Sequence, residues 1–453
     1  MLAAGQIPIV LHRAIRGVGG GNVVLIFYIF ALLPIVLVFL QSMDTQTLIP
    51  VLRAGVESML SFGYDVDVFL VCHYAVQPER LELVRKALPE SVGIQAWNES
   101  TPLAYLIEPK KTKVVPYTLA LARQHRFVIK DKLFEYDFFV SFEDDMVITG
   151  AHVENYLDMT RQLYQLREEA PEHDEEVTVG GGNTFYGTLT KSRLKRMFPG
   201  LLRVEVLLDE ANYGTQEQLD PIPITNRPHI DPKPCCHLPE YAVSPGRPAD
   251  PDSDKLFMWE TGIFSLGVRK MPSLQNAVST TSRDLGWVLM QRGPVLQGNL
   301  TIKDFWSGTG GLFKGRTGKG GERRPNPKAF DHINNQGGWM ATRQQIWEWH
   351  TEICPGGFLP PFDPGHYNFD GLDMRNVEYW SGGLSLFTKQ HACNMQRIVS
   401  LEPDRFARHL IYHAANNKQR QLHGQRRRFV KVNDLLGQLN TVRNNAQTEL
   451  ERQ

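Results

Sequence analysis

The chain has 453 residues, which is enough for one large domain or two closely packed ones. Lysine plus arginine number 49, and aspartate plus glutamate also number 49, so the formal net charge at pH 7 is zero. This balance removes bulk charge as a reason to expect a nucleic-acid partner, and any basic patch must be local. We therefore expect no nucleic-acid binding.

An uncharged apolar segment near the N-terminus is the best-defined local feature. Val23–Leu40 carries no charge over about 18 residues, which is close to the minimum for a membrane-spanning helix. A cleavable signal peptide is the alternative, but its apolar part normally has about 7–15 residues and ends at small residues. Arg13 and Arg16 precede the segment and Asp44 follows it, so the positive-inside rule places the N-terminus in the cytosol and the remainder in a lumen.

Helical and strand patterns alternate after this segment. Apolar spacing predicts helices over Thr47–Leu60, Pro78–Leu88 and Tyr117–Leu133, and strands over Asp67–Val71, Gly93–Trp97 and Tyr136–Phe142. Such alternation is typical of an α/β protein with a mostly parallel sheet flanked by helices. The last strand, YDFFVSF, reads as buried on both faces.

Three acids, Glu143, Asp144 and Asp145, follow this last strand. Ligands collect at the carboxyl ends of strands in open α/β sheets, and carboxylate oxygens suit a hard divalent cation that neutralises phosphates. Alternate residues of an extended chain point to the same side. We therefore expect Asp145 to bind metal, Glu143 to contact a ribose or a metal-bound water, and Asp144 to turn away. A solvated loop is the alternative for such a triplet alone, but the buried strand before it favours a site.

Between Gly150 and Phe330 the sequence loses its regular helix and strand patterns, which predicts insertions and mobile loops. The basic, glycine-rich run Gly308–Arg324 fails the Walker pattern, so it is either a flexible lid or disordered. Regular pattern resumes before Thr342, which begins a capping box and a helix. Near the C-terminus, His409 and His413 are spaced as one helical turn. The tail after Lys418 is polar and basic, and is read as a surface helix or partly disordered.

The stretch ALARQHRFVIKDKLFEYDFFVSFEDDMVI resembles the segment of Golgi GT-A glycosyltransferases in which an arginine-bearing helix leads into the strand carrying the acidic metal motif. Within that superfamily the chain is distantly similar to the N-acetylglucosaminyltransferase I family. The matching positions are Ala122, Arg123, Arg126 and Phe127 in the helix, Glu143–Asp145 in the acidic motif, Gly338–Met340 in a glycine-tryptophan turn, and Phe406–Lys418 in a late segment.

The resemblance implies a Rossmann-like GT-A fold, a bound Mn²⁺ or Mg²⁺, and a nucleotide-sugar donor. It implies metal ligation by Asp145 and by a late histidine, for which His413 is preferred. The positions that it assigns to the donor are Arg123, Arg126, Glu143 and Asp144. The acceptor base falls at Asp373, or at Asp370 three residues earlier, and an exposed Asp-Gly turn is the alternative for the same residues.

Two departures from that family are visible. The acid that usually holds the nucleotide base after the second strand is absent, and we expect Tyr74 to stack on the base instead. The link between Leu40 and Leu48 leaves no room for the family's first strand, unless the end of the hydrophobic segment supplies it.

The expected organisation is a cytosolic tail at 1–22, a transmembrane signal-anchor at 23–41, a nucleotide-sugar-binding half at 42–150, an insertion with mobile loops at 151–329, an acceptor-binding and catalytic half at 330–418, and a basic C-terminal tail at 419–453. Five cysteines permit at most two internal disulfides, and the sequons at Asn98 and Asn299 agree with a lumenal location.

The expected function is a single-pass Golgi membrane glycosyltransferase. It would move a hexose or N-acetylhexosamine, UDP-linked by preference, to a hydroxyl of a glycan or glycoprotein with inversion. The alternative is a membrane-anchored, non-catalytic carbohydrate-binding or scaffolding protein with the same fold. A lumenal metal hydrolase is a weaker third reading, because the sequence contains no H-E-x-x-H motif.

Overall fold

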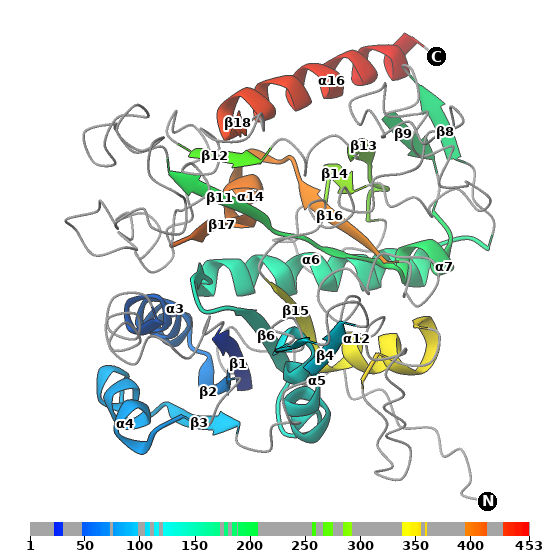
Figure 1. Ribbon diagram of the computed structural model, residues 1–453. Helices are drawn as coiled ribbons and strands as arrows, with labels where there is room; N and C mark the ends of the chain where they lie inside the picture. Colours follow the sequence, from blue (N-terminus) through cyan, green and yellow to red (C-terminus); the bar gives the residue numbers. More distant parts are fainter. Residues whose placement is uncertain are drawn as a thin grey trace, which may run out of the picture.

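The protein is a mixed α/β structure, seen here in a computed structural model (Figure 1). The structure describes residues 22–29, 48–72, 76–97, 105–108, 113–116, 121–172, 176–179, 184–187, 189–206, 256–259, 266–274, 284–291, 338–354, 358–359, 395–414 and 429–452. Several predictions fall outside these residues, namely those for Tyr74, Asp370, Asp373, the sequons at Asn98 and Asn299, and the run Gly308–Arg324.

A five-stranded sheet forms the lower half of the molecule in Figure 1. Its strands, in spatial order, are β15 (Gly338–Thr342), β6 (Phe138–Glu143), β1 (Asn22–Ile29), β2 (Asp65–Cys72) and β3 (Gly93–Trp97). The pairs β6–β1, β1–β2 and β2–β3 are parallel, and β15 is antiparallel to β6. This confirms the expected mostly parallel sheet. The strand order reverses between β1 and β6, and open α/β sheets bind ligands at such a switch point.

Strand β1 overturns the helical assignment of the N-terminal apolar segment over Asn22–Ile29. These residues pair with β2 on one side and with β6 on the other, and Val23 is buried. A central parallel strand is covered on both faces, so it reads as a continuous apolar run, as the start of a membrane helix does. The length of the uncharged segment alone therefore could not distinguish a membrane helix from a buried strand. In the described part of the chain, no helix is long and apolar enough to cross a membrane.

The helices around this sheet follow the predicted alternation. They are α3 (Ile49–Ser61), α4 (Pro78–Ala87), α5 (Leu121–Lys132) and α12 (Arg343–Glu348), which continues as a π-helical turn over Trp349–Ile353. The capping box at the start of α12 is confirmed: Thr342 Oγ1 accepts from the Gln345 backbone N–H at 3.1 Å, and the Gln345 side chain accepts from the Thr342 N–H at 2.9 Å.

A long helix, α6 (Gly150–Glu169), crosses the middle of the molecule between this sheet and the strands above it (Figure 1). It packs against α3, and the chain just before it also comes close to that helix: a Cβ added at Gly55 of α3 would lie 2.7 Å from the Ile148 carbonyl oxygen. The backbone N–H of Gly150 donates to Ser58 of α3 at 3.0 Å. These contacts anchor the chain directly after the acidic triplet.

Two further sheets and a hairpin complete the fold. One sheet has the order β10 (Met197–Pro199), β16 (Gln396–Ser400), β14 (Trp287–Gln291), β13 (Leu266–Lys270), β9 (Thr184–Gly187) and β8 (Glu176–Val179). The other has the order β18 (Phe429–Lys431), β12 (Leu256–Trp259), β11 (Leu202–Val206), β17 (Leu410–His413) and β7 (Met146–Val147). The hairpin pairs β4 (Tyr105–Glu108) with β5 (Lys113–Pro116).

The short helices α7 (Lys191–Leu194), α14 (Pro403–Phe406) and a 3₁₀ turn over Ala407–His409 join these strands, and α16 (Val432–Arg452) lies along the top in Figure 1. The segment 151–329, expected to be an insertion with mobile loops, therefore contributes α6 and strands of both upper sheets. Its strands pair with β16 and β17 from the late part of the chain, so the expected boundary at residue 330 does not separate two units. The strands of this segment were missed because they have only three to five residues, whereas the 20-residue helix α6 was missed despite its length.

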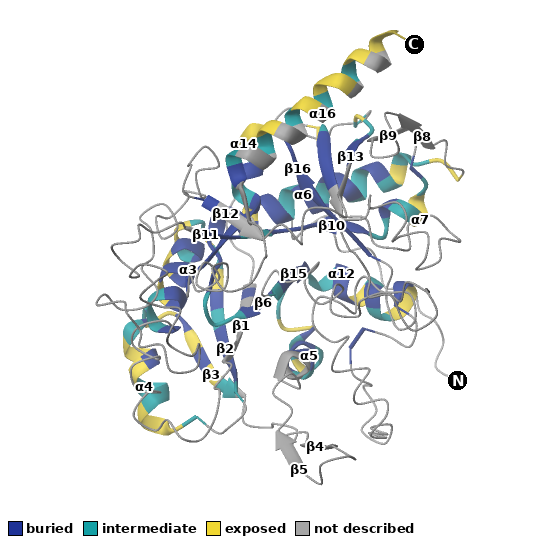
Figure 2. Ribbon diagram, turned by 45° about the horizontal axis from the view of Figure 1, so that its top comes forward, coloured by how far each residue is buried: buried dark blue, intermediate teal, exposed yellow. Residues whose placement is uncertain are grey.

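The main core fills the space between the first sheet and its helices, where five of the eight residues of β2 and five of the six residues of β6 are buried (Figure 2). Trp339 of β15 is part of this core. Its ring lies 6.0 Å from that of Trp349 and 5.3 Å from that of Phe358, and its indole N–H donates to His125 at 3.2 Å. The glycine-tryptophan segment is therefore a buried edge strand, and the turn expected there is not formed.

Candidate functional site

The acidic triplet reaches a histidine from the far end of the chain. Strand β6 ends at Glu143, and after a two-residue turn β7 pairs antiparallel with β17, with Met146 opposite His413. The Asp145 carbonyl accepts from the Ala414 backbone N–H at 2.7 Å. This pairing places Asp145 beside His413, 268 positions apart in sequence, with Asp145 Oδ2 2.6 Å from His413 Nε2.

Strand β11 adds two charged side chains to this place. It runs parallel to β17, and Arg203 and Glu205 are two residues apart, so they project from the same face of the strand. Glu205 Oε1 lies 2.5 Å from His413 Nδ1. One guanidinium nitrogen of Arg203 lies 2.5 Å from His413 Nε2, and the other lies 3.4 Å from Glu143 Oε2. We call Glu143, Asp145, Arg203, Glu205 and His413 the acidic cluster.

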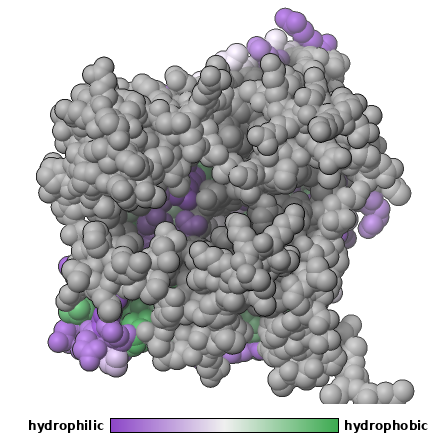
Figure 3. Space-filling model, viewed as in Figure 1, coloured by the Kyte–Doolittle hydropathy of each residue, from purple (hydrophilic) through white to green (hydrophobic). Residues whose placement is uncertain are grey.

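The acidic cluster is mostly withdrawn from solvent. The side chains of His413 and Glu205 are 2% and 3% exposed, whereas those of Asp145 and Glu143 retain 19% and 25%. Burial lowers the pKa of His413, and the Arg203 guanidinium acts in the same direction, but the Asp145 and Glu205 carboxylates outweigh both and hold that pKa above its ordinary value. On the face shown in Figure 3, the described residues in the central hollow are mainly hydrophilic.

The acidic cluster has the donor chemistry of a hard-cation site with few protein ligands. The bond from His413 Nδ1 to the buried Glu205 orients the imidazole ring, with Nε2 directed at Asp145. Within the part of the chain that the structure describes, no group of three or more histidine, cysteine, aspartate or glutamate side chains is placed to hold a metal ion. Asp145 and His413 alone suit a cation that completes its shell with phosphate oxygens and water.

The residues predicted to bind the nucleotide-sugar lie in helix α5 and in the turn after β6. Arg126 is buried in α5, where its guanidinium donates to the Phe358 carbonyl at 3.0 Å and lies 4.2 Å from the centre of the Phe358 ring. Arg123 belongs to the same helix, and Asp144 is half-buried in the turn after β6. Contact of these three residues with a nucleotide-sugar stays a prediction.

His409 does not share a helical face with His413, because the chain passes from the 3₁₀ turn into β17 between them. Both His409 nitrogens have backbone partners: Nδ1 lies 2.7 Å from the Gly200 oxygen, and Nε2 accepts from the Ser400 N–H at 3.1 Å. His152 is likewise held, by Thr149 and by the Leu410 oxygen. Burial lowers the pKa of each of these two histidines to about 4, so both stay neutral.

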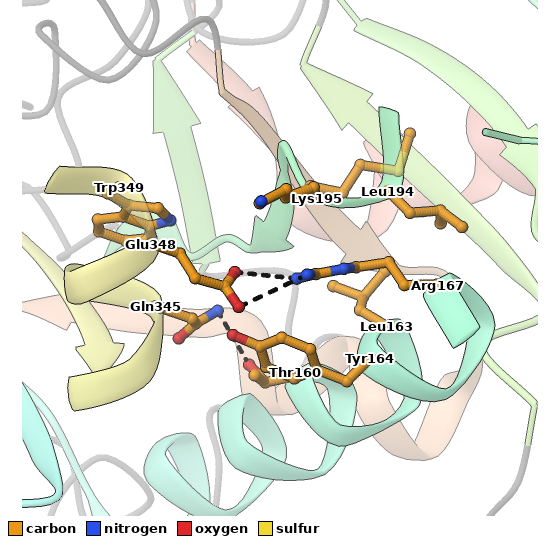
Figure 4. A pocket seen from close by; sticks show the side chains of 10 residues that line it. Thr160, Leu163, Tyr164, Arg167, Leu194, Lys195, Gln345, Glu348 and Trp349 are labelled. Atoms are coloured by element: carbon orange, nitrogen blue, oxygen red, sulfur yellow. Dashed lines mark hydrogen bonds and ion pairs between the residues drawn. The ribbon is translucent and has the colours of Figure 1, made fainter. Parts of the chain in front are cut away.

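A small surface pocket lies between α6, α7 and α12 (Figure 4). Its most prominent contact is an ion pair in which Arg167 faces Glu348, with N–O distances of 2.9 and 3.5 Å. Tyr164 packs on the same guanidinium, whose central carbon is 4.7 Å from the ring centre. The pocket shares no residue with the acidic cluster, and its contacts tie α6 to α12.

Arg203 and Glu205 were not anticipated from the sequence. The signal that was available is the alternation in LRVEV, which puts two opposite charges on one face of a short strand. A strand that shows charges to one side needs either solvent or a charged partner on that side. Nothing local in the sequence identifies the partner as His413.

Comparison of the chain with models of known protein families finds no match. Comparison with curated proteins finds no significant relative.

Proposed function

We propose that this protein is a metal-dependent glycosyltransferase of GT-A type, which transfers a sugar from a UDP-linked donor to a hydroxyl of a glycan or glycoprotein with inversion. The observation that carries this proposal is the convergence of Asp145 and His413 at 2.6 Å, at the carboxyl end of β6 beside the strand-order switch point. The strand order β6-β1-β2-β3 supports the Rossmann-like part of the fold.

Each residue of the acidic cluster has a distinct task in this proposal. Asp145 and His413 hold the cation, and Glu205 orients the imidazole through Nδ1. A bound Mn²⁺ or Mg²⁺ supplies positive charge to the diphosphate as it departs. Glu143, which is linked to His413 through Arg203, is assigned to the ribose or to a metal-bound water. Deprotonation of the acceptor hydroxyl is assigned to Asp373, with Asp370 as its substitute, and both lie outside the described residues.

A non-catalytic carbohydrate-binding protein is the second candidate, and one contact favours it. The guanidinium of Arg203 lies 2.5 Å from the His413 nitrogen that a metal would need. A protein in which Arg203 permanently neutralised the acids would keep the fold without needing metal. The two candidates differ in whether a nucleotide-sugar is consumed.

The deciding experiment is release of nucleoside diphosphate from a panel of UDP- and GDP-sugars, with Mn²⁺ and with a chelator. Asp145→Asn should lower Mn²⁺-dependent release by at least roughly 100-fold, because a metal supplies several kcal/mol of charge stabilisation and about 1.4 kcal/mol is tenfold in rate. Asp137→Asn is the matched control, since this partly exposed aspartate precedes β6 at its other end and pairs with Arg343 at 2.8 Å.

Near-normal turnover by Asp145→Asn would show that the site is wrongly assigned. If the unaltered protein consumes no donor in the panel but binds immobilised glycans, the second candidate replaces the first. If the unaltered protein stays active in the presence of the chelator, the reaction does not require a metal and that part of the proposal is wrong.

The proposed compartment is the Golgi lumen. Cys354 is disulfide-bonded, and disulfides persist in oxidising compartments. Attachment to the membrane stays a prediction, to be tested by carbonate extraction together with glycan analysis at Asn98 and Asn299. A single helix that starts at Val23 cannot provide it, because Asn22–Ile29 forms β1.

A further inference from the structure

Two exposed aromatic side chains contact each other at the surface. Among the described residues, the large apolar side chains that stay exposed are Leu83, Phe134 and Trp347, at 46%, 67% and 37%. Phe134 lies in the turn after α5 and Trp347 lies in α12, and their ring centres are 5.9 Å apart. A single exposed apolar side chain is ordinary, but two aromatic rings brought together from distant parts of the chain form a surface that a partner can recognise.

A charged pair lies beside the two rings. The Arg343 guanidinium donates to the Phe134 carbonyl at 3.4 Å, across 209 positions in sequence, and pairs with the Asp137 carboxylate at 2.8 Å. Arg343 precedes Trp347 by about one turn, so both project from the same face of α12. The Arg343 and Asp137 side chains keep 42% and 40% exposure, so solvent molecules and ligands can reach them. We call Phe134, Asp137, Arg343 and Trp347 the aromatic patch.

The chemistry of the aromatic patch matches that of a sugar ring. The planes of the two aromatic rings are inclined by 57°, so neither ring covers the face of the other. A pyranose has an apolar C–H face and a rim of hydroxyl groups, and it therefore needs an apolar surface below it and hydrogen-bonding groups at its edge. The aromatic rings supply the surface, while the guanidinium donates to hydroxyls and the carboxylate accepts from them.

The area and the charge of the aromatic patch favour a sugar over other partners. An aromatic side chain has roughly 150–250 Å² of surface, so the exposed parts of the two rings amount to about 200 Å². A stable protein partner needs about 800 Å² on each side. The neighbouring charges cancel in two ion pairs at 2.8 Å, Arg343–Asp137 and Lys132–Glu135. Nucleic acids and anionic membranes require a positive surface instead.

The aromatic patch is separate from the acidic cluster. Asp137 directly precedes β6, whereas Glu143 is the last residue of that strand. Because a strand rises about 3.3 Å per residue, these two positions lie about 20 Å apart, at opposite ends of β6. One sugar ring cannot contact both places, so a sugar on the aromatic patch would occupy a second site.

We propose that the aromatic patch binds one hexopyranose unit of an uncharged glycan. The apolar face of the sugar stacks on Phe134 and Trp347, and its hydroxyls form hydrogen bonds with Arg343 and Asp137. Such a site holds a glycan-bearing partner at the protein surface and takes no part in sugar transfer, so it raises the local concentration of that partner. It needs neither metal nor nucleotide, and it is equally compatible with a transferase and with a non-catalytic carbohydrate-binding protein.

The experiment titrates chitotetraose, cellotetraose and mannotetraose into the purified full chain and follows binding by saturation-transfer NMR, without donor or Mn²⁺. At least one of these sugars should bind the unaltered protein. Trp347→Ala and Phe134→Ala should each weaken that binding by at least about fivefold, because each removes one ring of the stacking surface. Trp347→Phe retains a ring and should stay within about threefold of the unaltered protein.

Leu83→Ala is the matched control, because Leu83 is 46% exposed on α4 but has no aromatic ring. It should leave the binding unchanged. Thermal unfolding checks that each variant is folded. If Trp347→Ala does not fold, the test rests on Phe134→Ala, whose side chain is the most exposed of the three at 67%.

Four results would overturn the inference. The first is that none of the three sugars binds at millimolar concentration. The second is that binding persists unchanged in both alanine variants, and the third is that Leu83→Ala weakens it as much as they do. The fourth is a different occupant, seen as a dimer in analytical ultracentrifugation or as flotation with phosphatidylcholine vesicles that is lost in Trp347→Ala. None of these results bears on Mn²⁺-dependent consumption of a nucleotide-sugar, so the proposed function stands or fails separately.

Discussion

Replacing Glu205 by glutamine should weaken Mn²⁺ binding in the presence of UDP without unfolding the protein. Glu205 is buried, and its carboxylate accepts from His413 Nδ1 at 2.5 Å, so it fixes the ring with Nε2 directed at Asp145. Glutamine keeps the shape but removes the charge, and its amide can donate to Nδ1, which would place the proton on Nε2. The imidazole would then present a hydrogen where the metal needs a lone pair.

The magnitude follows from the type of bond lost. A hydrogen bond to a charged group contributes about 1.5–3 kcal/mol, which corresponds to roughly 10–100-fold in the dissociation constant. Removal of the outer partner of a metal-bound histidine typically has an effect of this size. The measurement is an Mn²⁺ titration by electron paramagnetic resonance, with thermal unfolding as the check on folding.

Glu348→Gln is the matched control, because Glu348 is also mostly buried, at 12% side-chain exposure, but pairs with Arg167 in the pocket of Figure 4. It should alter stability and leave Mn²⁺ binding unchanged. A Glu205→Gln protein whose Mn²⁺ affinity stays within about threefold of the unaltered protein would refute the reasoning, since second-sphere partners normally matter by more than that.

Three further predictions concern stability, and each is measured by urea unfolding. Gly338→Ala should lower the free energy of unfolding by about 1–3 kcal/mol, because the added Cβ would lie 2.1 Å from a backbone oxygen of β6; a loss under about 0.5 kcal/mol would contradict this. The Arg167–Glu348 pair should show a coupling of about 1 kcal/mol in a double-mutant cycle, and additive effects would argue against it. His152 and His409 are held neutral with each pKa lowered to about 4, so the stability they contribute is complete above about pH 6.5 and is lost as pH falls toward 4, by up to about 3 kcal/mol each. An unchanged pH slope in His152→Gln and His409→Asn would contradict that assignment.

Local sequence patterns were sufficient to predict the helices and strands that have long or strongly periodic sequences. The helix predicted over Thr47–Leu60 is α3, the strand over Tyr136–Phe142 is β6, and the capping box at Thr342 starts α12. In each case the signal lies within about 15 residues, because amphipathic spacing and capping are properties of neighbouring positions. The position of the acids at the end of a buried strand could be predicted for the same reason.

The tertiary structure decided what local patterns leave open. The apolar run that begins at Val23 is compatible with both a membrane helix and a strand that is covered on two faces. Only its pairing with β2 and β6 identifies it as a strand. The acidic cluster depends on the register of β7, β11 and β17, which brings Asp145, Arg203 and Glu205 to His413 across as many as 268 positions. Hydrogen bonding between distant strands leaves no periodic pattern in the sequence of either strand. The sequence by itself therefore determined which side chains have the chemistry of a site. The pairing of the strands decided which of these side chains contact one another.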